Sequence, residues 1–143
     1  MARIEDRHPV FVYGTLRCGQ GNHGLLGGNV AAIFAAQLPG HLLYADGLPY
    51  VAECADPGAA VTGDLAVLDP SPYEAVLARL DRLEGHRADG MGLYVRAARP
   101  VRYEAAGGVW EDTLAWVYHG GRSFSYRSDL LVAGGNWLAG RAA

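Results

Sequence analysis

The sequence predicts an α+β domain whose sheet is curled or closed into a small barrel. Strand-like segments outnumber helical ones, and they do not follow a strict β-α-β alternation. The length of 143 residues suits one hydrophobic core, and no linker or internal repeat divides the chain. We therefore expect a single domain spanning residues 1–143.

Four strands are expected before the only strong helical pattern. The first is Val10–Tyr13, a short apolar run that leads into a glycine-rich stretch. Val30–Leu38 and His41–Tyr44 are apolar runs separated by a Pro-Gly turn signal. Ala60–Leu68 alternates between apolar and polar residues, as a strand with one buried face does.

The helix is predicted over "SPYEAVLARLDRLEG". Ser71 is a good N-cap, Pro72 suits the first helical position, and Glu74 completes a capping box with Ser71. Gly85 is placed to end the helix, because glycine adopts the left-handed conformation that follows a last turn.

Two long strands are expected after the helix, Leu93–Tyr103 and Val109–Tyr118, joined by a hairpin at "EAAGG". The tail, "SYRSDLLVAGGNWLAG", is predicted to be irregular with one short helix.

The composition limits the classes of function. Half of the residues are hydrophobic, 19% are charged and the net charge is −3, which is typical of a globular protein. No basic run interleaves with aromatic residues, so we expect no nucleic-acid partner. No stretch approaches the roughly 20 apolar residues that a membrane span needs. All twelve basic residues are Arg, which excludes a Walker-type phosphate loop and a Lys Schiff base.

The start of the chain and its cysteines indicate a cytoplasmic protein. The first strand begins by Val10, so no signal peptide fits ahead of it. Cys18 and Cys54 are accordingly expected to be reduced thiols rather than a disulfide. We expect a monomer or a weak homodimer.

One carboxylate lies on the wrong side of the predicted helix. At about 100° per residue the apolar face comprises Tyr73, Val76, Leu77, Leu80 and Leu83. Glu84 falls within this stripe, with Asp81 at its border. Burial and the negative end of the helix dipole both raise the pKa of such a carboxylate toward the range of a general base. The alternatives are a frayed last turn that exposes Glu84, or an ion pair with Arg87 or Arg96.

Other candidate sites are weak. The five histidines, His8, His23, His41, His86 and His119, form no metal-ligand spacing with each other or with the cysteines, so no metal site is predicted. No G-x-S-x-G nucleophile motif is present. Tyr94, Trp116 and Tyr118 are expected to be core residues.

Two motifs carry a resemblance to a known family: "VFVYGTLRCGQGN" at the end of the first strand, and "LDRLEG" followed by "LYVR". Together they resemble the γ-glutamylcyclotransferase-like superfamily, and the first motif looks especially like its γ-glutamylamine cyclotransferase branch. The tail "GGNWL" is similar to the "GDW" ending of bacterial members, with Asn136 in place of Asp. The resemblance implies a small mixed β-barrel with flanking helices and one substrate cavity.

The resemblance also implies roles for individual residues. Glu84, which the helical pattern singles out independently, corresponds to the general acid/base. The γ-glutamyl group would be held by the loop Tyr13, Gly14, Thr15 and Leu16, with Asn22 bracing the loop and Tyr126 contacting the substrate. Backbone N–H groups in a glycine-containing loop suit a carboxylate, because the missing side chain permits close approach.

The implied activity is the cyclisation of a γ-glutamyl-amine or γ-glutamyl-amino acid to 5-oxoproline with release of the amine. Such an amide-cleaving cyclotransferase needs no metal or cofactor, and its partner is a small γ-glutamyl compound. The alternatives are removal of a γ-glutamyl protecting group from a biosynthetic intermediate, and a binding protein without turnover. The segment 86–92 lengthens the chain between Glu84 and Tyr94 and is expected to shape the cavity mouth.

Overall fold

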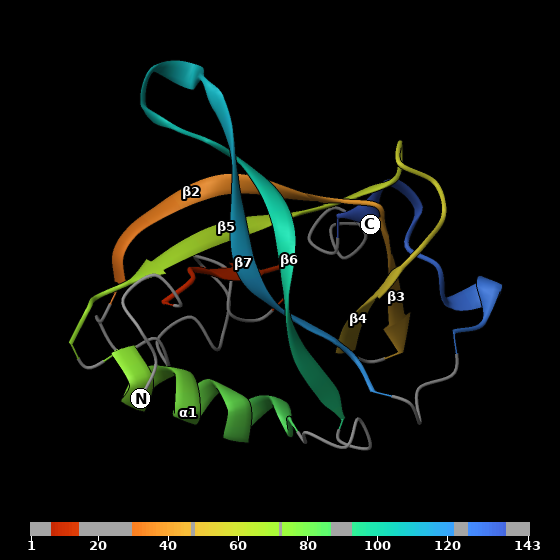
Figure 1. Cartoon of the computed structure of the whole chain (residues 1–143). Coiled ribbons are helices and arrows are strands. Elements are labelled where there is room, and N and C mark those ends of the chain that lie inside the picture. The colour runs from red at the N-terminus through yellow and green to blue at the C-terminus, as the bar shows by residue number, and fades with distance from the viewer. Residues whose placement is uncertain are drawn as a thin grey trace.

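The computed structural model describes residues 7–14, 30–46, 48–71, 73–86, 93–121 and 126–136. The strands are β1 (Val10–Val12), β2 (Val30–Pro39), β3 (His41–Asp46), β4 (Leu48–Glu53), β5 (Ala60–Leu68), β6 (Tyr94–Glu104) and β7 (Trp110–Gly120), and the α-helix is α1 (Tyr73–Glu84). In Figure 1, α1 lies beneath the strands, β3 and β4 stand to one side, and the β6–β7 hairpin rises above them.

Five strands close into a barrel in the order β1-β5-β2-β6-β7. The short strand β1 completes the barrel, because it pairs antiparallel with β5 at Val10↔Ala66 and parallel with β7 at Val10↔Trp116. Closure leaves neither edge of β1 unpaired, which accounts for how three residues can hold a place in the sheet. The prediction of a small mixed barrel is confirmed.

The second sheet contains a strand that the sequence analysis missed. β3 and β4 form an antiparallel pair with His41 opposite Glu53 and Ala45 opposite Pro49. The glycine and proline of "DGLPYVAE" indicate a turn by composition, which hides β4 from a pattern search. Proline is tolerated there because β4 pairs in a sheet with β3 alone among the described strands and so lies at an edge.

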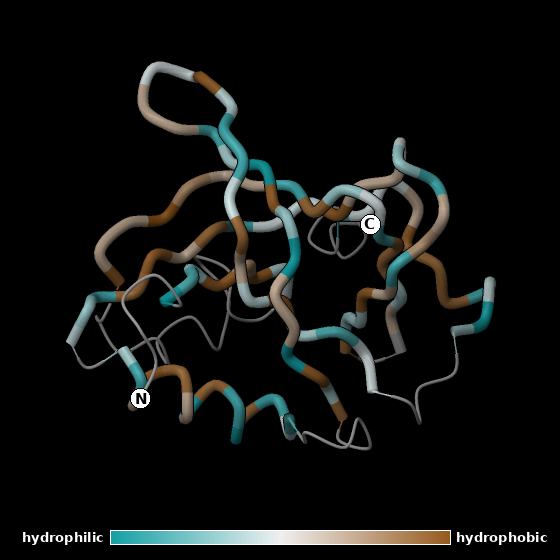
Figure 2. The backbone as a smooth tube through the Cα atoms, viewed as in Figure 1, coloured by the Kyte–Doolittle hydropathy of each residue, from teal (hydrophilic) through white to brown (hydrophobic). Residues whose placement is uncertain are grey.

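The helix α1 begins and ends close to the predicted positions, although Pro72 lies outside the described residues. Tyr73, Val76 and Leu80 are buried, as the apolar face requires, and Figure 2 shows hydrophobic and hydrophilic residues alternating along the helix. Leu83 differs from the prediction, since 43% of it is exposed. It lies at the wall of a cavity, not under the barrel.

The core consists of two hydrophobic clusters, and alternate residues of a strand contribute to one cluster or the other. In β1, Val10 and Val12 join the cluster that contains the buried face of α1. Phe11 and Tyr13 join the second cluster, to which β3 contributes Leu43. This is the period of two that a strand buried on both faces must show. Tyr94 and Tyr118 are buried, as expected, and Trp116 packs at the margin of the first cluster.

Short 3₁₀ turns complete the described chain. One, Ala106–Gly108, forms the tip of the predicted β6–β7 hairpin. The tail was expected to hold one short helix, and its described residues, 126–136, form two such turns instead, Ser128–Leu130 and Ala133–Gly135. Among the described residues α1 is the only α-helix, and none of the helices there has the length and apolar character needed to cross a membrane.

Candidate active site

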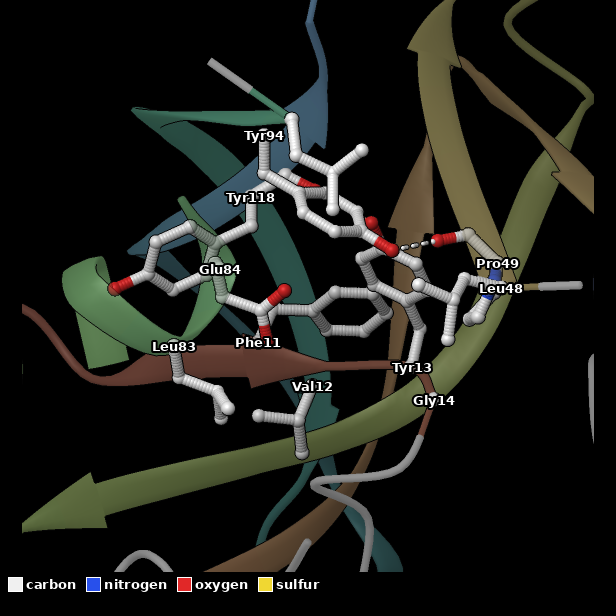
Figure 3. Close-up of a pocket in the computed structure, with 11 residues that line it drawn as sticks. Phe11, Val12, Tyr13, Gly14, Leu48, Pro49, Leu83, Glu84, Tyr94 and Tyr118 are labelled. Atoms are coloured by element: carbon white, nitrogen blue, oxygen red, sulfur yellow. Dashed lines mark hydrogen bonds between the residues drawn. The ribbon is translucent and has the colours of Figure 1, made fainter. Parts of the chain in front are cut away.

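A cavity of about 160 Å³ opens between the end of β1, the start of β4, the end of α1 and the near ends of β6 and β7. Figure 3 shows the side chains that surround it. Most of its wall is apolar or aromatic, and the lining residues are Phe11, Val12, Tyr13, Gly14, Leu48, Pro49, Leu83, Glu84, Leu93, Tyr94 and Tyr118.

The end of α1 places Glu84 at this cavity. Gly85 has a φ of +65°, and its N–H donates to Arg82 O at 3.2 Å, while the N–H of His86 donates to Asp81 O at 2.9 Å. These two bonds form a Schellman motif, in which the chain reverses at a left-handed glycine. Glu84 is therefore the last helical residue, and Figure 3 shows its carboxylate pointing into the cavity toward the ring of Phe11.

The environment of Glu84 favours the protonated acid. Loss of solvent contact raises the pKa of its carboxyl from 4.5 to about 7. Within the described part of the chain, no hydrogen bond or ion pair reaches this carboxylate. The alternative pairing with Arg96 is wrong, because the Arg96 guanidinium binds Asp81 instead. Arg87, the other alternative partner, lies outside the described residues.

Asp81 holds a network of its own behind the cavity wall. Arg96 donates to its carboxylate through Nε at 2.8 Å and Nη2 at 3.2 Å, and the hydroxyl of Tyr118 donates to Oδ1 at 2.7 Å. The guanidinium also lies over the ring of Trp116, 4.2 Å from its centroid. Asp81 and Glu84 therefore have opposite surroundings. Asp81 accepts hydrogen bonds from Arg96 and Tyr118, whereas Glu84 accepts none from the described residues.

The tyrosine hydroxyls around the cavity donate hydrogen bonds to other groups of the protein. The hydroxyl of Tyr13 donates to the backbone carbonyl of Tyr118 at 2.5 Å, and that of Tyr94 donates to Pro49 O at 2.7 Å. Burial raises the pKa of all three tyrosines well above the ordinary value. They therefore stay neutral, which leaves Glu84 as the ionisable side chain of the lining that titrates near neutral pH.

Gly14 is enclosed by β4. A Cβ built on Gly14 would lie 2.6 Å from Cγ of Pro49, closer than real Cβ contacts come. The glycine at the end of β1 is therefore required by the packing of Pro49, whatever the loop after it binds. Any side chain at residue 14 would push β4 away from β1 and change the cavity between them.

Some of the predicted site residues come together and others do not. Tyr13, Gly14 and Glu84 line one cavity. Thr15, Leu16 and Asn22 lie outside the described residues, so their predicted roles stay predictions. Tyr126 is not part of the cavity lining; 39% of it is exposed, and its ring meets that of Tyr44 edge-on at 5.3 Å.

The sequence analysis missed several residues of the wall. Leu48 and Pro49 were missed because β4 was not predicted. Tyr94 and Tyr118 were assigned to the core, and they are buried, but one side of each also faces the cavity. The "LYVR" stretch, which contains Tyr94 and Arg96, was the one available signal, because Tyr94 lines the cavity and Arg96 binds Asp81.

The family described as "Gamma-glutamyl cyclotransferase, AIG2-like" matches residues 10–139. No curated protein sequence is significantly similar to the chain.

Solved structures share the fold. An AIG2-like protein from Mus musculus superposes with a TM-score of 0.64 and 24% identity, over 91% of this chain and 87% of that one. YkqA from Bacillus subtilis superposes with a TM-score of 0.66 and 23% identity over 95% of this chain, which spans 43% of the Bacillus protein. An uncharacterized protein from Pyrococcus horikoshii superposes with a TM-score of 0.59 and 20% identity, over 94% of this chain and 93% of that one.

Proposed function

This chain belongs to the AIG2-like gamma-glutamyl cyclotransferase family, and on that premise we propose that it converts a γ-glutamyl-amine or γ-glutamyl-amino acid to 5-oxoproline and a free amine. The observation that carries the proposal is the carboxylate of Glu84. It stands in the wall of the cavity without a partner among the described residues, and its pKa is raised to about 7. A group with that pKa can both accept and return a proton at neutral pH.

The reaction needs one proton shuttle. Ionised Glu84 takes a proton from the substrate's α-ammonium, and the freed amine attacks the γ-carbonyl carbon of the same molecule. The new C–N bond closes the five-membered lactam, and the bond from that carbon to the leaving nitrogen breaks. Protonated Glu84 gives its proton to the leaving nitrogen, and the released amine takes the second proton that the ring nitrogen loses, so it departs as an ammonium. The carboxylate is thereby regenerated and no water is consumed.

The shape of the cavity supports the ring closure. Because nucleophile and electrophile belong to one molecule, the protein has to fold the substrate into the attack geometry and keep it there. The rings of Phe11, Tyr94 and Tyr118 give the cavity rigid walls. We assign the α-carboxylate of the substrate to the backbone N–H groups that follow β1, beginning at Gly14.

A panel of γ-glutamyl compounds that differ only in the leaving amine tests the proposal. The expected product is 5-oxoproline in an amount equal to the released amine. Preference for one large biosynthetic amine over simple amino acids would favour the deprotecting role. Release of glutamate in place of 5-oxoproline, or ligand binding without any product across the panel, would contradict the proposal.

A further inference from the structure

A second group of polar side chains meets away from the cavity. His41 begins β3 and Glu53 ends β4, directly opposite each other in the register of the pair. His119 comes from β7, which lies beside β4. One ligand atom from each of His41, Glu53 and His119 lies within 4.8 Å of the other two. None of the three lines the cavity at Glu84.

One hydrogen bond determines which nitrogen of the His41 ring carries hydrogen. Nδ1 of His41 lies 2.9 Å from the carbonyl oxygen of Pro39, and a carbonyl only accepts, so this nitrogen is protonated. The Nε2 of the neutral His41 ring therefore presents a lone pair, and it faces Nε2 of His119. Nε2 of His119 can donate a hydrogen to this lone pair, or give up that hydrogen and present a lone pair of its own to a metal.

The spacing of the two Nε2 atoms suits a shared metal ion, because they are only 3.0 Å apart. Nitrogens that are each about 2.05 Å from a tetrahedral Zn²⁺ are about 3.3 Å apart. The pair therefore needs only a few tenths of an ångström of movement to bind one ion, and the bond from Nδ1 to Pro39 O holds the His41 ring as an outer partner of a metal-bound histidine does.

The carboxylate of Glu53 offers one oxygen as a metal ligand, and Arg99 binds the other oxygen. The Nε of Arg99 donates to Oε1 of Glu53, which leaves the second carboxylate oxygen for a metal. The side chain of Glu53 is 55% exposed, so an ion can enter from solvent. The guanidinium opposes a cation by its charge, but it also fixes the ligating carboxylate.

We propose that His41, His119 and Glu53 bind one late first-row transition-metal dication, with Zn²⁺ as the expected ion. Two imidazoles and a carboxylate are ligands that Zn²⁺ prefers, and a fourth position stays open to water. The sequence analysis predicted no metal site, because residues 41, 53 and 119 show no ligand spacing along the chain. Such an ion would fasten β4 to β7, and β4 carries the cavity residues Leu48 and Pro49.

The experiment uses the full chain without an affinity tag, after dialysis against a chelator. Titration with ZnCl₂ by calorimetry should show one equivalent bound with micromolar or tighter affinity, and Zn²⁺ should raise the melting temperature. Co²⁺ in the same site should give the intense visible absorption of a four-coordinate ion. His41→Gln and His119→Gln should each weaken Zn²⁺ binding at least about 100-fold, since loss of an outer partner alone costs 10- to 100-fold.

Two controls and a third variant keep the outcome decisive. His8→Gln, which removes a ring packed on Trp116, and Glu84→Gln should both leave Zn²⁺ affinity unchanged; the latter separates this site from the proposed reaction. Glu53→Gln alters an exposed side chain, so this variant should fold normally. Its affinity for Zn²⁺ should nevertheless be lower than that of the wild-type chain. The proposal is overturned if the wild-type chain does not bind Zn²⁺, or if all three ligand variants bind it with unchanged affinity. The contact between the rings of His41 and His119 would then be explained by a hydrogen bond alone.

Discussion

The hydroxyl of Tyr118 donates a 2.7 Å hydrogen bond to Asp81, three residues before Glu84 on α1. Arg96 also donates to Asp81, so its guanidinium is already paired. Glu84 is left in an apolar cavity with a pKa of about 7. The surroundings of the two carboxylates therefore differ: Asp81 is ion-paired and hydrogen-bonded, whereas Glu84 has a pKa in the range that suits proton transfer.

Glu84→Gln should lower kcat by on the order of 10²-fold or more, the usual effect of a positioned acid/base group. The amide keeps the shape of the side chain but accepts no proton at neutral pH. Substrate affinity should survive, because the amide oxygen can still accept a hydrogen bond from the ammonium. Assays of 5-oxoproline release together with ligand binding by calorimetry measure both quantities.

Glu74→Gln is the matched control, because Glu74 is an exposed glutamate in the first turn of the same helix. It should retain full turnover. Activity of Glu84→Gln above about a tenth of the wild-type value would contradict the assignment, because an acid/base group is worth more than that.

The pH dependence of stability should reveal Glu84 without any substrate. Its pKa is near 4.5 when unfolded and about 7 when folded, so the folded state binds the proton more tightly. The stabilisation is complete below pH 4.5 and is lost as the pH rises through 7. Glu84→Gln should therefore be more stable than wild type at pH 8, by on the order of 2 to 3 kcal/mol, with the difference vanishing at low pH. Urea unfolding at several pH values measures it.

The catalytic efficiency kcat/KM should depend on the same ionisation of Glu84, but it should rise with pH where the stability falls. Only ionised Glu84 can accept the first proton, so kcat/KM should rise with pH and level off above about 7. A profile that is flat between pH 5 and 8 would be inconsistent with Glu84 as the base.

Gly14→Ala should weaken both the fold and the site, because the new Cβ would lie 2.6 Å from Cγ of Pro49. We expect a loss of about 1 to 3 kcal/mol of stability, typical of overpacking, and a lower kcat/KM. Pro49→Ala in the same chain should recover part of the stability. A double-mutant cycle by thermal unfolding measures this coupling, and strictly additive effects would show that the two residues do not touch.

Asp81→Asn should destabilise the protein by about 1 to 3 kcal/mol, since it removes the charge that Arg96 and the Tyr118 hydroxyl share. Asp112→Asn is the control. Asp112 pairs with Arg102 at 3.6 Å on an exposed hairpin, where an ion pair contributes little. Denaturant unfolding of both variants compares them, and equal stabilities would mean that the network behind the cavity is not structural.

Cys54→Ser should leave turnover within a few-fold of wild type, because the proposed reaction uses no thiolate. Cys54 is a free thiol whose Sγ approaches the backbone oxygen of Asp56. Complete loss of 5-oxoproline release in the folded variant would point to a covalent mechanism instead.

The sequence by itself determined the helix, most of the strands and the place of Glu84 within an apolar stripe. These follow from local rules: the spacing of Tyr73, Val76 and Leu80 fixes the buried face of α1, and Gly85 fixes its end. Glu84 can be identified from this pattern because one residue on an apolar face breaks a short-range regularity.

The tertiary structure alone decided the closure of the barrel, the strand β4 and the partners of the charged groups. Whether Arg96 pairs with Asp81 or Glu84 depends on the position of β6 beside α1, and no local preference encodes it. Pro49 acquires its place against Gly14 only when β4 packs on the end of β1. Likewise His41 and His119, 78 residues apart in the chain, meet because two sheets pack together, and interactions of that kind arise from chain folding rather than from spacing along the sequence.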